Sequence, residues 1–205
     1  MSVRLASTRT KVLASAALVA AAAGAAGLGT FGSFTSSTSA SASVSSGTVA
    51  IALGAGGTAA NRLTVAATGL VPGDTVQRGV TLSNTGNQAL SAVALTTSAT
   101  TSSLLDTDPA NGLQLTIQGC SVPWTELGTG KYTYTCGGTV STVLASRAVI
   151  GSNVALSGLN SLTAGAADNL VVTLSFPAVA GNALQGQSSV ISFSFTGTQR
   201  AGTNQ

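Results

Sequence analysis

Two aspartates and an asparagine in the segment "LLDTDPANG" come closest, by type and spacing, to a metal site. Asp106, Asp108 and Asn111 offer the oxygen ligands that Ca²⁺ prefers. The same letters also predict an Asx turn at Asp108-Pro109, or the N-cap and first position of a short helix. The turn is the favoured interpretation, with calcium as a weak alternative and no other metal expected.

The sequence contains no histidine. It therefore lacks the usual general base for a serine or cysteine nucleophile and every His-based zinc motif. A Ser–Lys pair would need Lys131, which follows Gly130 and is interpreted as an exposed turn charge. The glycine-bearing stretches 54–57 and 128–131 lack the spacing of a phosphate loop. We predict that the protein is not an enzyme, has no catalytic residue and binds no cofactor.

The N-terminus resembles a secretory signal. A basic start, "MSVRLASTRTK", precedes an Ala-rich apolar run that contains small residues suited to a signal peptidase. The uncharged stretch 12–34 is also long enough for an uncleaved anchor, which needs about 20 residues, but Ala and Gly disfavour insertion. We expect a helical signal peptide at 1–32 with an approximate cleavage site. The mature protein would be secreted, extracellular or at the cell surface, and would touch the membrane only before cleavage.

Two cysteines remain in the exported chain, Cys120 and Cys136. A disulfide is the default in an oxidising compartment. A metal pair is the alternative, but two thiols without histidine make a poor site. Trp124 lies between them, and packing beside the disulfide is favoured over an exposed ligand anchor.

Charge excludes one class of partner. Three of the eight basic residues lie within the first eleven positions, and the other five balance the five acidic residues. The neutral mature chain has no basic surface for phosphates, so we expect no nucleic-acid binding.

The elements that position these residues are predicted to be strands. Apolar residues alternate with small or polar ones in several short runs. Turn signals separate the runs at Pro72–Asp74, Asn84–Asn87, Asp108–Gly112 and Ala180–Asn182. The segment 142–150, "TVLASRAVI", is the best candidate for a short helical turn. We predict an all-β, jelly-roll-like antiparallel β-sandwich over 48–205. The alternating runs are centred on Val49, Ile51 and Leu53; Val76, Val80 and Leu82; Val93 and Leu95; Leu113, Leu115 and Ile117; Tyr132, Tyr134 and Cys136; Leu170, Val172, Leu174 and Phe176; and Ile191, Phe193 and Phe195.

Four fragments in order resemble the TasA/camelysin family of exported proteins from Gram-positive bacteria. They are "GTFGSF" after the apolar run, "SVSSGTVAIAL", "GLVPGDTVQRGVTLSNTGNQAL" and the closing "VISFSFTGTQRAGT". The resemblance implies a signal peptide cleaved by a dedicated peptidase and a jelly-roll sandwich that assembles into biofilm-matrix fibres. It also implies that an N-terminal strand of one subunit completes the sheet of its neighbour. A metallopeptidase activity is attributed to the family, but without histidine no catalytic residue is carried over.

The Ser/Thr/Ala-rich segment 33–47 is the predicted donor. No charge lies between Lys11 and Arg62, so the usual protection against edge-to-edge pairing is missing. The expected assembly residues are Phe34, Val44, Gly47 and Val49, with the chain itself as partner in a head-to-tail polymer. Other matrix or cell-surface components are possible further partners.

Three alternatives stay open at this point. The segment 33–47 can also be a plain linker. The protein would then be a non-polymerising Ig-like surface or adhesion module. A secreted protease is the least favoured function.

Overall fold

The computed structural model describes residues 47–63, 65–67 and 69–202. The predicted signal peptide and the segment 33–46, with Phe34 and Val44, lie outside the described residues. In the described part, no helix has the length and apolar character needed to cross a membrane.

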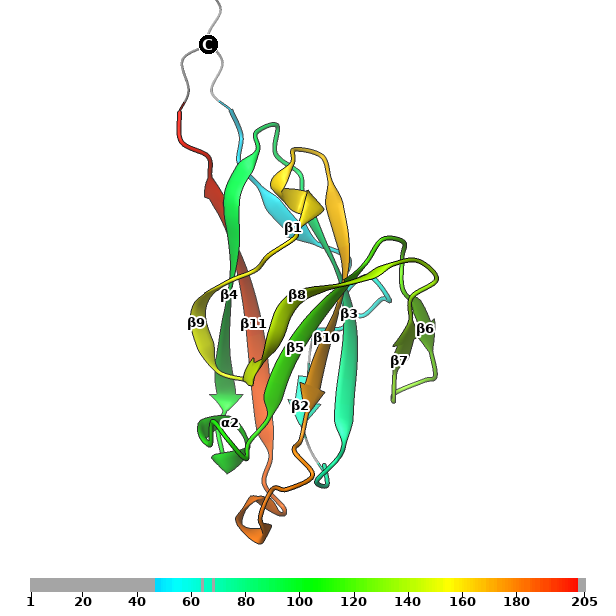
Figure 1. The fold of residues 1–205 in the computed structure, drawn as a ribbon, viewed down its shortest axis with the longest axis vertical. Helices are drawn as coiled ribbons and strands as arrows, with labels where there is room; N and C mark the ends of the chain where they lie inside the picture. The colour runs from blue at the N-terminus through cyan, green and yellow to red at the C-terminus, as the bar shows by residue number, and fades with distance from the viewer. Residues whose placement is uncertain (1–46, 64, 68, 203–205) are drawn as a thin grey trace, which may run out of the picture. The chain divides into compact units, whose positions relative to one another are not determined.

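Two antiparallel sheets make up the described fold (Figure 1). The first has the order β1-β3-β10-β5-β8, with β10 paired to β3 and β5 on its two sides. Its strands are β1 (Ile51–Leu53), β3 (Thr75–Asn84), β10 (Ala167–Ser175), β5 (Gln114–Cys120) and β8 (Val140–Ala148).

The second sheet has the order β2-β11-β4-β9. Its strands are β2 (Val65–Ala67), β11 (Ser189–Gln199), β4 (Leu90–Thr101) and β9 (Gly151–Ala155). A separate hairpin joins β6 (Thr125–Leu127) to β7 (Thr133–Thr135). Successive strands of the two main sheets alternate between the layers, except that β5 and β8 pair within the first sheet. The predicted all-β, jelly-roll-like antiparallel fold is confirmed.

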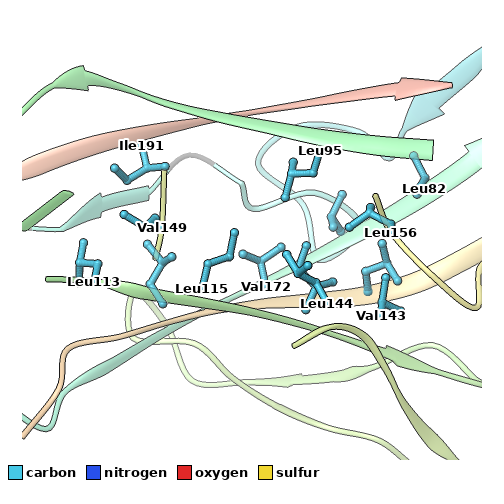
Figure 2. Close-up of a cluster of buried hydrophobic side chains, with 14 of the residues drawn as sticks. Leu82, Leu95, Leu113, Leu115, Val143, Leu144, Val149, Leu156, Val172 and Ile191 are labelled. Carbon is cyan, nitrogen blue, oxygen red and sulfur yellow. The ribbon is translucent and has the colours of Figure 1, made fainter. Parts of the chain in front are cut away.

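The core lies between the two sheets and is filled mainly by alternate residues of their long strands (Figure 2). Leu113, Leu115 and Ile117 of the β5 run are at most 1 % exposed, as are Leu170 and Leu174 on β10. Each such buried side chain contributes about 1.5–3 kcal/mol relative to an exposed one. The alternation in the sequence therefore identified most of the core. Leu53 of the first run is exposed, and the run at Tyr132, Tyr134 and Cys136 lies outside the core cluster.

The predicted helical turn at 142–150 is wrong. These residues form most of β8 and the crossing to β9. Register shifts in the β5–β8 pair disturb the alternation, and Val143 and Leu144 are both buried in succession. Two adjacent apolar residues imitate a helical period, but cross-strand pairing decides the conformation.

Short helical turns occur in the connections instead. They are α2 (Leu104–Thr107), η1 (Asn160–Leu162) and η2 (Asn182–Leu184). Ser103 caps α2: its Oγ accepts a hydrogen bond from Leu105 N–H, and its own N–H donates to the Asp106 carboxylate, which forms a capping box.

Candidate functional site

Strand β11 has an open edge. It pairs with β4 along Val190–Gln199, whereas on its other side β2 pairs only with Ser189–Ile191. Among the residues that the structure describes, no strand pairs with Ser192–Gln199 on the side away from β4. We call this segment the open edge. Unpaired backbone groups along a strand are a template for another strand.

The side chains of the open edge suit an added strand. Phe193 and Phe195 pack against the core but are only partly buried. Ser192, Ser194 and Thr196 are exposed on the other face, and no residue of the segment is charged. An extended segment laid beside β11 would cover more of the two aromatic rings.

The other sheet edges are irregular or short. β8 carries Arg147 and two register shifts. β9 is broken by a register shift against β4 and by Asn153, whose φ of 51° is left-handed. β1 is only 3 residues long. Bulges, charges and short strands are devices that discourage strand addition, and the open edge has none of them between Ile191 and Thr198.

Of the predicted assembly residues, Gly47 and Val49 are described. Thr48 donates its N–H to Asn87 Oδ1 at 2.6 Å, and Asn87 N–H donates to the Thr48 carbonyl at 3.0 Å. Val49 packs against the core of its own domain. A donated segment would therefore end before Val49.

The start and the end of the described chain leave from one end of the sandwich (Figure 1). Gly47 packs against the Gln88 side chain. Arg200 donates from Nη2 to Gln88 Oε1 at 3.1 Å. Gly47 thus lies near the C-terminal end of β11.

In the structure, hydrogen bonds within the chain occupy the carboxylates of both acidic calcium candidates. Asp106 is 5 % exposed and accepts hydrogen bonds from Ser102 Oγ, Ser103 N and Ser189 Oγ at 2.6–2.8 Å. Asp108 ends α2, so it is not the N-cap of a following helix. Its carboxylate accepts from the backbone N–H groups of Ala110 and Asn111 and from Asn111 Nδ2. The predicted Asx turn is present.

Cys120 and Cys136 are joined by a disulfide. It closes the insertion between β5 and β8 that carries β6 and β7. We call residues 121–135 the disulfide hairpin. Trp124 is partly buried, and its indole N–H donates to the Asn169 carbonyl on β10 at 3.0 Å.

Sequence reasoning missed the cluster that holds the disulfide hairpin on the outer face of the first sheet. Arg62 donates from Nε and Nη2 to both carboxylate oxygens of Glu126, at 2.9 and 2.8 Å. The Tyr134 hydroxyl donates to Glu126 at 2.7 Å, and Tyr134 N–H donates to Gln77 on β3. Arg62 and Glu126 are 64 residues apart in a chain with few charges, and nothing local signals their pairing.

The ion pair and burial shift the acidities in the cluster. The hydrogen bond from Arg62 holds the pKa of Glu126 below its usual range, and the Tyr134 hydroxyl adds to that effect. Glu126 in turn raises the pKa of Arg62. Burial raises the pKa of Tyr134. At neutral pH, Glu126 and Arg62 therefore stay ionised and the Tyr134 hydroxyl stays protonated. Together the three side chains hold the hairpin against the sheet.

The donor atoms do not fit a zinc ion. The chain has no histidine, and both cysteines are in the disulfide. Within the described ranges, which hold every acidic residue of the chain, no three His, Cys, Asp or Glu side chains gather as a metal site. No step of a metallopeptidase reaction can be assigned to these residues.

A family model described as camelysin metallo-endopeptidase matches residues 8–118, more than half of the chain. The match ends within β5, before the disulfide hairpin. No curated protein sequence matches the chain.

Proposed function

This chain belongs to the camelysin family, and on that premise we propose that it is a secreted structural protein that assembles into extracellular matrix fibres. One subunit donates part of its segment 33–46 to the open edge of the next. The observation that carries the proposal is the unpaired, uncharged side of β11 at Ser192–Gln199.

Backbone pairing supplies the affinity in this proposal. Each hydrogen bond gained along the open edge contributes about 0.5–1.5 kcal/mol net. Side chains supply the fit, because alternate residues of an added strand face the core. Phe34 and Val44 are the large apolar residues of the donor segment, and in an extended strand they lie about 33 Å apart. In a given register, one of them would therefore cover Phe193 and Phe195.

The contact would propagate. The donor segment and the open edge are different surfaces, so the contact is heterologous and builds a filament unless the rotation closes a ring. The chain itself is the principal partner, and other matrix or cell-surface components are further partners. The protein acts outside the cell as a structural component and not as an enzyme.

Hydrogen exchange combined with electron microscopy tests the proposal. The mature protein should form fibres in which the amides of Ser192–Gln199 exchange slowly. A variant that begins at Gly47 should stay monomeric, with the same amides exchanging quickly. The outer edge of β8 serves as the internal control, because its amides should exchange alike in fibre and monomer.

Two results would overturn the proposal. One is fibre formation by the variant that begins at Gly47. The other is equal protection of Ser192–Gln199 in dilute monomeric mature protein, which would mean that the segment 33–46 completes the edge of its own domain.

A further inference from the structure

The disulfide hairpin closes a cavity that strand donation does not use. The cavity has a volume of about 430 Å³ and lies between the hairpin tip, the start of β3 and the turn before it. Its walls include Asp74, Thr75, Arg78, Lys131, Tyr132 and Thr133. This volume is within the range of about 300–1,000 Å³ that is usual for ligand sites.

The cavity carries an excess of positive charge. Arg78 and Lys131 line it against a single carboxylate, Asp74, which accepts a hydrogen bond from Val71 N–H at 3.0 Å. In the part of the chain that the structure describes, neither cation forms an ion pair. Arg78 donates one N–H to the Gln77 carbonyl, at 2.7 Å. Its other N–H groups can meet an anionic group in a fixed planar arrangement.

The aromatic wall is held in place by a second arginine. The Arg62 guanidinium carbon lies 4.3 Å from the centre of the Tyr132 ring, and that of Arg78 lies 5.5 Å away. Arg62 is itself fixed by its paired hydrogen bonds to Glu126. Tyr132, Leu70 and Val76 add an apolar lining to the cavity beside its cations.

We infer that this cavity binds an acidic sugar unit of a polysaccharide. Arg78 and Lys131 would bind its carboxylate or phosphate, and Tyr132 would pack against the apolar face of the sugar ring. Thr75 and Thr133 also line the cavity, and their hydroxyl groups can donate hydrogen bonds to sugar hydroxyls and accept them. The inference does not depend on strand donation.

Binding to the variant that begins at Gly47 tests this inference separately from fibre formation. The probes are oligogalacturonate, which carries carboxylates, and a phosphorylated oligomannose, which carries phosphates on its sugar rings. Dextran and single-stranded DNA of matched length are the comparisons. We expect one acidic oligomer to bind, with the stronger probe identifying the anionic group. Titration calorimetry measures each affinity.

Variants locate the site. Arg78→Gln and Lys131→Gln should each weaken binding by about tenfold, the scale of one charge-assisted hydrogen bond. Arg147→Gln on β8 removes the same charge elsewhere and should leave the affinity unchanged. Thermal unfolding of each variant checks that the fold is intact. Equal binding of dextran or DNA, an equal loss in Arg147→Gln, or no binding of either acidic probe overturns the inference.

Discussion

Asp106 illustrates how burial turns a candidate metal ligand into a structural hydrogen-bond acceptor. Its place in an acidic, turn-forming segment suggested a metal ligand. In the structure, its carboxylate is buried and accepts hydrogen bonds from three donors. Burial alone would raise the pKa of Asp106, but the hydrogen bonds from Ser189, Ser103 and Ser102 outweigh it and lower the pKa below 3.8. The ionised carboxylate joins α2 to the start of β11.

We predict that Asp106→Asn lowers the free energy of unfolding by about 1–3 kcal/mol at pH 7, because an amide cannot accept all three hydrogen bonds. The pKa of Asp106 is lower in the folded state, so its stabilisation is present above about pH 4. It is lost as the pH falls through the folded pKa. Urea unfolding from pH 7 to pH 2 should show the two proteins converging in acid. The turn variant Asp74→Asn should cost less, and a constant gap across pH would contradict the assignment.

Gly79 shows the same dependence on tertiary contact. It lies inside β3, where glycine normally weakens a strand. A Cβ there would lie 2.9 Å from Tyr134 Cε1 and 2.9 Å from the Ala59 carbonyl. The absent side chain therefore leaves room for the hairpin tyrosine.

We predict that Gly79→Ala destabilises the protein by about 1–3 kcal/mol through overpacking against Tyr134. Thermal unfolding measures the change. Gly181→Ala is the matched control, because a Cβ at Gly181 meets no atom within 4 Å. Equal melting temperatures for Gly79→Ala and the natural protein would show that the ring can move away without cost.

At the scale of elements, the disulfide hairpin acts as a cover for the first sheet. Val171 on β10 has the opposite parity to the core residues Leu170 and Val172, yet it is 1 % exposed. Its cross-strand neighbour is Gly79, on which the Tyr134 ring lies. The hairpin thus buries a second, smaller apolar surface outside the main core.

Replacing both cysteines by serine should lower the free energy of unfolding by about 3 kcal/mol, the value for a loop of about 15 residues. Trp124, the only tryptophan of the chain, reports on the hairpin directly. In the double variant, Trp124 fluorescence should shift to the red at a lower urea concentration than the one that unfolds the sandwich. Reductant should reproduce the effect in the natural protein and leave the double variant unchanged. A Trp124 transition that coincides with global unfolding in both proteins would refute a separately held hairpin.

At the scale of the whole molecule, the contrast between edges is the basis for assembly. The edge strands β1 and β2 are short, and the edges at β8 and β9 are bulged or charged. The uncharged side of β11 is regular from Ser192 to Thr198. That contrast favours addition of a strand at one place and thus one repeating contact.

A synthetic peptide of residues 33–46 should cap growing fibres by occupying the open edge. Fibre length in electron micrographs should fall as peptide concentration rises. A control peptide with Phe34→Lys and Val44→Lys should have little effect, because charged residues would face the core. Equal shortening by both peptides would show that fit to the sandwich is irrelevant.

The sequence by itself determined most of the strands, much of the core and the family, because alternation and ordered motifs are local signals. The helical turn expected at 142–150 was the exception. The sequence also identified the cysteines that pair. It could not locate the open edge, because an edge is defined by which strand is absent beside β11. Nor could it bring Arg62 to Glu126, place Tyr134 over Gly79, or bury Asp106 against Ser189. Those contacts join residues far apart in the chain, and only the packing of two sheets and a covering hairpin decides them.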